Sequence, residues 1–174
     1  DEEWKSRISA TIPELPLARF ARFMEEFGLG KKEAAALIDD RDVCFFYEDT
    51  IAAMKDLGIS HARAGKLAAN ILLQSGAKRA NERHAEIHQL GISPRQVASI
   101  GKLREDGKLN NQNADELFGL LCAETATPSS ASSSASSVAN PSSVLSAVEQ
   151  LAQSRNMLVV KDDAAMGRWI DQAI

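Results

Sequence analysis

Apolar residues recur at the spacing of an α-helix along most of the chain, and this periodicity constrains the fold more than any other feature of the sequence. The clearest case follows Ser60, where the apolar residues are Ala64, Leu67, Ala68, Ile71 and Leu72. No segment of useful length alternates between apolar and polar residues as a half-buried strand would. The sequence therefore predicts an all-α fold.

The N-terminal stretch carries the most specific pattern. Pro13 and Pro16 predict an extended segment that leads into a helix, and Gly28 is placed to end that helix in the left-handed conformation. The expected buried face of this helix consists of Leu17, Phe20, Ala21 and Met24. Asp39 or Asp40 can cap a later helix. Its expected buried face consists of Val43, Phe46, Tyr47 and Met54.

Two small helical modules joined by a polar helix are predicted from the pattern that follows. Gly76 is expected to end the preceding helix, and the polar helix is expected over residues 78–90. The sequence Ser93-Pro94-Arg95-Gln96 then predicts a capping box at the start of a new helix. We therefore place one module at residues 1–90 and the other at residues 91–174.

The composition changes at residues 123–143, which are rich in serine and alanine. Such a segment buries too little apolar surface to offset its loss of conformational entropy, so we predict a flexible linker that interrupts the second module. Asn140 and Pro141 predict the start of the next helix, and Asp162 the start of a final one. Their expected apolar faces are Val144, Leu145, Val148, Leu151 and Ala152 for the first helix, and Met166, Trp169, Ile170 and Ala173 for the second.

Short motifs along the chain form a recognisable set. They are Ile12-Pro13-Glu14-Leu15-Pro16, Arg19 with Arg22, Phe27-Gly28-Leu29, Phe46-Tyr47-Glu48, Ala69-Asn70-Ile71-Leu72, Ile92-Ser93-Pro94 and Asp106-Gly107-Lys108-Leu109-Asn110. This set resembles the B subunit of the tRNA-dependent aspartyl/glutamyl-tRNA amidotransferase (GatB). The resemblance covers the middle helical domain of that family and the first half of its YqeY-like tail domain. The terminal three-helix piece, which the family uses near the tRNA, is expected to be missing from the chain.

The resemblance implies an activity for the parent enzyme, a ligase that converts Glu-tRNA(Gln) or Asp-tRNA(Asn) to the amidated form with glutamine as amido donor. It implies tRNA, an amidase subunit and a small third subunit as partners, and ATP and Mg²⁺ as cofactors of the parent's catalytic domain. Nothing of that domain is visible in this sequence. The chain is therefore expected to hold and position tRNA, without a catalytic residue or a cofactor of its own.

The composition also leads to expectations about the cellular location of the chain. Cys44 and Cys122 each lie in a helical apolar pattern, which predicts buried reduced thiols and a cytoplasmic location. No apolar run approaches the roughly 18 residues of a membrane span, so no membrane contact is expected. The chain begins with Asp1 and not with methionine, so we expect it to be a piece of a longer protein.

The sequence contains no recognisable motif for catalysis or metal binding. No serine occupies the strand-to-helix turn of a nucleophile elbow, and no glycine-rich phosphate loop occurs. His84 and His88 are four residues apart on the predicted polar helix and could share a metal ion, but Glu86 points to another face and no third ligand presents itself. Two solvent-facing histidines are the simpler interpretation, so neither a metal site nor a catalytic residue is predicted.

One constellation of residues points to a function, and it is basic: Arg63, Lys66, Lys78, Arg79, Arg83, His84 and His88. Cationic groups neutralise phosphates irrespective of sequence, and folded RNA is recognised largely through its backbone and shape. The simpler interpretation is that these residues solvate a polar helix. We predict that they bind tRNA, and that reversing Lys78, Arg79 and Arg83 to glutamate abolishes binding.

The alternative is a helical protein-interaction module without nucleic-acid binding. The net charge of −4 and the long linker support it. A continuous positive stripe along the helices that carry the basic residues would favour RNA. A patchwork of charges with an apolar groove would favour a protein partner.

Overall fold

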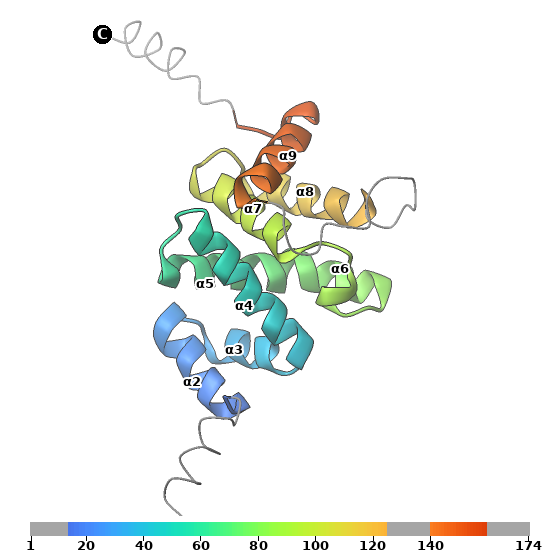
Figure 1. Ribbon diagram of the computed structural model, residues 1–174. Coiled ribbons are helices and arrows are strands. Elements are labelled where there is room, and N and C mark those ends of the chain that lie inside the picture. Colours follow the sequence, from blue (N-terminus) through green and yellow to red (C-terminus); the bar gives the residue numbers. More distant parts are fainter. Residues whose placement is uncertain (1–13, 125–139, 160–174) are drawn as a thin grey trace, which may run out of the picture.

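The computed structural model describes residues 14–124 and 140–159, and these segments form packed helices (Figure 1). In chain order they are α2 (Pro16–Phe27), α3 (Lys31–Ile38), α4 (Arg41–Asp56), α5 (His61–Ile71), a π-helix (Leu72–Gly76), α6 (Ala77–Arg83), a 3-10 helix (Ile87–Gln89), α7 (Pro94–Glu105), α8 (Asn111–Glu124) and α9 (Pro141–Ser154). No strand occurs in these two segments, which confirms the predicted all-α class.

The helices are stacked along the long direction of the molecule (Figure 1). α2 and α3 lie at one end, α4 and α5 in the middle, and α7, α8 and α9 at the other end. α4 packs against both α5 and α7, and α9 packs against α7. One cluster of buried apolar side chains extends from Phe23 to Met157, across the predicted boundary between residues 90 and 91. That division into modules stays a prediction.

An aromatic cluster joins the first helices to α5. Phe23 and Tyr47 are fully buried, with ring centroids 5.0 Å apart in an edge-to-face arrangement. Phe27 lies 6.0 Å from Tyr47 in a similar geometry. The Tyr47 hydroxyl donates a hydrogen bond to the carbonyl oxygen of Gly65 at 3.0 Å, which ties α4 to α5. The predicted buried face of α4 is thereby confirmed.

The predicted buried face of α2 was wrong at two of its four positions. Leu17 is 79 % exposed and Ala21 is exposed, whereas Phe23 and Phe27 are the buried residues of this helix. Phe20 and Met24 are partly buried beside them. The same 3.6-residue period fits both faces, and packing against the ring of Tyr47 selects the one with the larger aromatic side chains.

The predicted helix ends agree with the structure where the signal is local. Gly28 follows α2 with φ of 60°, and the Asp40 side chain accepts a hydrogen bond from the Val43 amide at 2.8 Å. At α7 the Gln96 amide donates to the Ser93 hydroxyl at 3.3 Å, and the Ser93 amide donates to Oε1 of Gln96 at 2.8 Å. This confirms the capping box.

Ser93 and Ser60 offer a matched test of that cap. Both occupy N-cap positions, but the Ser60 side chain makes no capping hydrogen bond. We expect Ser93→Ala to lower the free energy of unfolding by about 1 kcal/mol, since alanine cannot accept from the Gln96 amide. Ser60→Ala is expected to change it by less than about 0.5 kcal/mol. Chemical denaturation of both variants checks this, and equal losses would contradict the assigned role of Ser93.

The helix that begins with α5 does not end at Gly76 as predicted. It passes through the π-helix and continues as α6 without interruption. A Cβ atom at Gly76 would lie 3.3 Å from Ile87 and 3.7 Å from Phe118. Gly76 is therefore needed for close packing and not for ending the helix.

The predicted polar helix over residues 78–90 is correct only as far as Arg83. α6 ends at Arg83, His84 adopts a left-handed conformation with φ of 52°, and the chain turns into the 3-10 helix. In a continuous helix Ile87 would lie about 16 Å along the axis from Gly76. The turn instead brings Ile87 back against Gly76, where it is buried.

The later helices also bury apolar side chains, and on α9 these follow the predicted apolar face. Val97 and Ile100 of α7, and Leu117 and Phe118 of α8, are buried. On α9, Val148 and Ala152 are buried, while the other predicted residues, Val144, Leu145 and Leu151, are half-buried against the core. Ala123 and Glu124 of the predicted linker belong to α8, and Pro141–Ser143 belong to α9. The rest of the linker and the predicted final helix lie outside the described residues.

Candidate nucleic-acid interface

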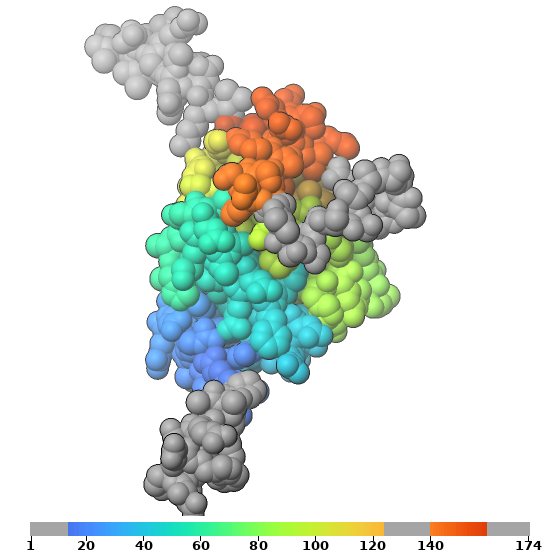
Figure 2. Space-filling view, in the orientation of Figure 1, coloured from blue at the N-terminus to red at the C-terminus, as the bar shows by residue number. Residues whose placement is uncertain are grey.

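The predicted basic residues separate into an exposed group and a packed group. Arg63 and Lys66 lie one turn apart on α5, and both are exposed. Lys78 lies on α6, and 59 % of its side chain is exposed. Because the π-helix joins α5 to α6, these three cations stand along one uninterrupted helical rod. Figure 2 shows α6 and the residues after it, in light green, at the edge of the molecule.

Arg104, at the end of α7, joins this group although the sequence did not predict it. Its side chain donates to Oδ1 of Asn111 at 2.6 Å. Burial, and next the nearby Arg63 guanidinium, lower the pKa of Arg104 from its usual value. Arg63 itself donates to Glu105 at 2.9 Å. A basic residue in the last turn of a helix is usually explained by its favourable interaction with the helix dipole. The sequence around Arg104 therefore did not indicate that it lies beside the cations of α5.

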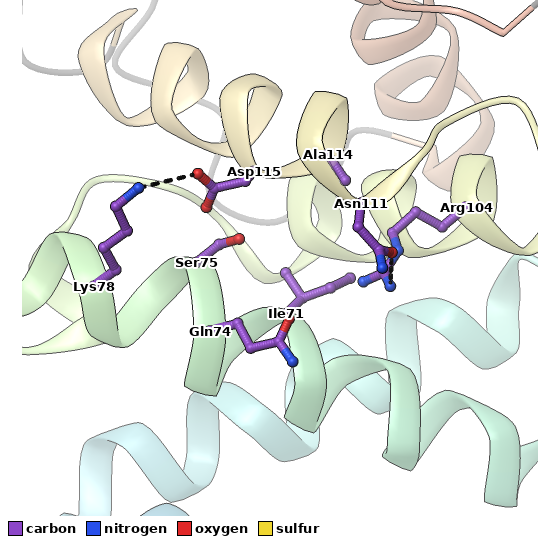
Figure 3. A pocket seen from close by; sticks show the side chains of 8 residues that line it. All are labelled: Ile71, Gln74, Ser75, Lys78, Arg104, Asn111, Ala114 and Asp115. Carbon is purple, nitrogen blue, oxygen red and sulfur yellow. Dashed lines mark hydrogen bonds and ion pairs between the residues drawn. The ribbon is translucent and has the colours of Figure 1, made fainter.

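A polar hollow lies between the π-helix and α6 on one side and the end of α7 and start of α8 on the other (Figure 3). Its volume is about 210 Å³, and its polar lining consists of Gln74, Ser75, Lys78, Arg104, Asn111 and Asp115. Figure 3 shows Lys78 at one end and Arg104 at the other, with Ile71 on the floor between them. We call the rod and this hollow, with the side chains of Arg63, Lys66, Gln74, Lys78, Arg104 and Asn111, the basic face.

The charge balance around the basic face is positive. Its four cations are Arg63, Lys66, Lys78 and Arg104, and Arg79 is packed next to it, between α6 and α8. Among the described residues, their ion pairs involve the carboxylates of Glu105 and Asp115. A local surplus of cations therefore exists on a chain whose net charge is −4. Such a surplus attracts phosphates. At ordinary salt, negative charges more than about 10 Å away are largely screened and do not cancel it.

Arg79 is packed between α6 and α8. Only 12 % of its side chain is exposed, and it donates to Oδ1 of Asp115 at 2.7 Å and to the Ser75 carbonyl oxygen at 3.0 Å. Its guanidinium lies 5.4 Å from the centre of the Phe118 ring. A Cβ atom at Gly119 would collide with it. Arg79 thus holds α6 against α8, and little of its guanidinium is left for a phosphate.

The hydrogen bond from Arg79 holds the pKa of Asp115 well below its usual value. A lowered pKa in the folded state stabilises the fold above the unfolded-state pKa of about 3.9, and this contribution is lost as the pH falls below it. We expect Asp115→Asn to lower the free energy of unfolding at neutral pH by about 1–2 kcal/mol, because the carboxylate is one-third exposed. The difference from wild type should shrink between about pH 5 and pH 2.

Glu105→Gln is the matched control for this prediction. Its pair with Arg63 is more exposed, with 57 % of the arginine side chain accessible, so we expect a loss below about 0.5 kcal/mol. Urea denaturation of both variants across this pH range makes the comparison. A loss for Asp115→Asn that does not change with pH would contradict the assigned pair.

The other predicted basic residues lie outside the basic face. Arg83, at the end of α6, is exposed and donates to the Cys122 carbonyl oxygen at 3.3 Å. His84 is exposed at the end of α6, beside a shallow hollow lined also by Asn81 and Glu86. His88 is half-buried on the 3-10 helix, so the two histidines do not share a helix. Among the described residues, no group of three His, Cys, Asp or Glu side chains is arranged to hold a metal ion.

The arginines of the N-terminal motif hold α2 against α4. Arg22 donates to Glu14 at 2.9 and 2.6 Å and to Glu48 at 2.5 Å. The hydrogen bond from Arg22 lowers the pKa of Glu14. Arg19 donates to Sγ of Cys44 at 3.3 Å and lies 5.0 Å from the centre of the Phe45 ring. These arginines are therefore engaged within the protein.

The cysteines are buried, as predicted, and burial raises the pKa of both thiols. In the part of the chain that the structure describes, no helix combines the length and the apolar character needed to cross a membrane.

Comparison with known proteins places the chain in a family. A family profile described as the GatB domain matches residues 56–174. The B subunit of the aspartyl/glutamyl-tRNA(Asn/Gln) amidotransferase of Bradyrhizobium sp. is 29 % identical over 174 residues, which is 100 % of this chain and 30 % of that protein. The protein of the same name from Thermobifida fusca is 32 % identical over 100 % of this chain and 28 % of its own length. The one from Geobacillus thermodenitrificans is 34 % identical over 68 % of this chain and 23 % of its own length.

The chain thus spans less than a third of the length of these relatives. The profile match includes every helix from α5 to α8, and therefore the whole basic face. The chain belongs to the GatB domain family.

Proposed function

We propose that this chain is the tRNA-positioning part of the B subunit of an aspartyl/glutamyl-tRNA(Asn/Gln) amidotransferase. In that enzyme Glu-tRNA(Gln) or Asp-tRNA(Asn) is converted to the amidated form with glutamine as amido donor. The chain holds the body of the tRNA so that its charged end reaches a catalytic domain elsewhere in the enzyme. Such positioning lowers the entropic cost of bringing the reactants together.

The observation that carries the proposal is the positive surplus on the basic face. Arg63, Lys66 and Lys78 are exposed along one helical rod, and Arg104 stands beside Arg63. Exposed cations along one rod support RNA over a protein partner, because they can follow a phosphate backbone. The lining of the hollow contains no aromatic ring on which a base could stack, so contacts to the phosphate backbone are the kind that this surface offers.

The remaining chemistry is assigned to other parts of the assembly. ATP and Mg²⁺ belong to the parent's catalytic domain, and the amidase and a small third subunit are partners of the complete GatB protein. The chain contributes no catalytic group and works in the cytoplasm. Arg79, although predicted to bind RNA, acts on this surface indirectly by holding α6 against α8.

A salt titration tests the proposal. We expect an unmodified tRNA transcript to bind with micromolar or weaker affinity in a filter-binding assay. The logarithm of the association constant should fall linearly with the logarithm of the salt concentration, with a slope of about −3 to −4 if the four exposed or partly exposed cations each meet a phosphate. No binding at low salt, or binding that does not respond to salt, would contradict it.

The alternative function as a protein-interaction module is favoured by a different surface. Leu15 and Leu17 of the α2 region are 63 % and 79 % exposed, and Phe45 of α4 is 38 % exposed. None of the three belongs to the basic face. Leu17→Ser should therefore leave tRNA affinity unchanged, and a loss of binding to another component of the amidotransferase in that variant would assign this surface to a protein contact.

A further inference from the structure

The polar hollow of the basic face has features that a purely electrostatic surface does not need. Lys78 and Arg104 stand at its two ends, and Gln74 and Asn111 supply side-chain amides between them (Figure 3). Its volume of about 210 Å³ is below the range of about 300–1,000 Å³ that is typical of small-molecule sites. The hollow therefore suits a short part of an extended ligand better than a whole small molecule.

The amides in the hollow keep unused hydrogen-bonding capacity. The Gln74 side chain is exposed, and its amide makes no hydrogen bond to the described residues. Asn111 accepts from Arg104 through Oδ1, which leaves its two N–H donors available. Asp115, by contrast, is already engaged by Arg79 and Lys78. The available groups thus both donate and accept, as partners of a hydroxyl must.

The backbone places these groups on a stable support. Gln74 and Ser75 belong to the π-helix, a rare element that is often found at functional sites. The Arg79–Asp115 pair fixes the opposite wall, α8, relative to α6. Asn110 caps α8 by accepting from the Asn113 amide at 2.7 Å, which fixes the first turn of the helix where Asn111 lies.

We propose that this hollow binds the sugar–phosphate backbone of RNA and recognises a ribose 2′-hydroxyl. Gln74 and Asn111 hydrogen-bond the hydroxyl, while Lys78 and Arg104 meet the phosphates on either side of it. The 2′-hydroxyl distinguishes RNA from DNA and is displayed in the shallow minor groove of A-form helices. This inference rests on the proposed function, since it assigns part of the tRNA-binding surface to a specific contact.

The test compares two probes that differ only at the 2′ position. One is an RNA hairpin with a continuous A-form stem, and the other is the same sequence with 2′-O-methyl groups, which keep the phosphate charge and the A-form shape. We expect the full chain to bind the 2′-O-methyl hairpin about tenfold more weakly, through the loss of one or two hydrogen bonds.

Gln74→Met and the double variant Gln74→Met/Asn111→Leu identify the residues. Both leave the charge unchanged, and Gln74→Met removes no hydrogen bond within the described residues, so the fold is preserved. We expect Gln74→Met to reduce the preference for the unmodified hairpin and the double variant to abolish it. The affinity of each variant for the 2′-O-methyl hairpin, measured at the same salt concentration, is the reference from which its preference is calculated.

The outcomes separate this inference from the proposed function. If wild type binds both hairpins equally, with salt-dependent affinity, the inference is overturned and the proposed function stands. If neither hairpin nor tRNA binds, both fail. If the double variant keeps the full preference for the unmodified hairpin, the hollow is not the 2′-hydroxyl site and the inference is overturned.

Discussion

Gly65→Ala is expected to lower the free energy of unfolding by about 2–3 kcal/mol, although alanine normally favours a helix over glycine by about 1 kcal/mol. Gly65 lies on α5 against α2, and a Cβ atom there would overlap the ring of Phe27. That ring cannot move aside, because Phe23 and Tyr47 pack around it. The Gly65 carbonyl oxygen also accepts the hydrogen bond of Tyr47, so any shift of α5 strains a second contact.

Gly101→Ala is the matched control. Gly101 is a buried glycine on α7, and a Cβ atom there would meet the end of the Met54 side chain. A methionine has three rotatable side-chain bonds and can turn away at small cost. We expect this variant to lie within about 1 kcal/mol of wild type. Equal losses for the two variants in chemical denaturation would contradict the assigned role of the rigid aromatic cluster.

The sequence predicted the features that depend on neighbouring residues. The cap formed by Asp40, the capping box at Ser93 and the left-handed turn at Gly28 require only a few adjacent positions, and all three are confirmed. The buried face of α4 also followed from its period, because its apolar side chains leave one consistent choice.

The features that depend on distant contacts could not be predicted. Gly76 was interpreted as a helix end, but it is required by Ile87 and Phe118, which lie 11 and 42 residues further along the chain. The face of α2 was chosen by packing against Tyr47. Arg104 joins Arg63 only because α7 ends beside the start of α5, and the pairing of Arg79 with Asp115 spans 36 residues. The sequence therefore predicted which residue types form the basic face but not which of them are turned outward.

Reversing three exposed cations of the basic face is expected to weaken tRNA binding about 100-fold or more at low salt. The variant carries Arg63→Glu, Lys66→Glu and Lys78→Glu, which turns three phosphate contacts into repulsions. These positions replace the set chosen from the sequence alone, since Arg79 and Arg83 contact α8 and their loss would also destabilise the fold. The slope of the salt dependence should become less steep by about 3.

A control with the same change in net charge separates the basic face from the overall charge of the chain. Lys31→Glu, Lys32→Glu and Arg41→Glu alter exposed residues on α3 and at the start of α4 that do not belong to the basic face. We expect the control variant to weaken binding less than about tenfold, because it changes the overall charge without removing a phosphate contact. Circular dichroism and a denaturation curve establish that both triple variants are folded.

The most direct measurement of the central claim is the ratio of tRNA dissociation constants for these two triple variants, taken side by side at one low salt concentration. If this part of the GatB protein holds tRNA through α5, the π-helix and α6, the basic-face variant binds at least about tenfold more weakly than the equally charged control. A ratio near one, with both variants folded, would show that the basic face does not hold the tRNA.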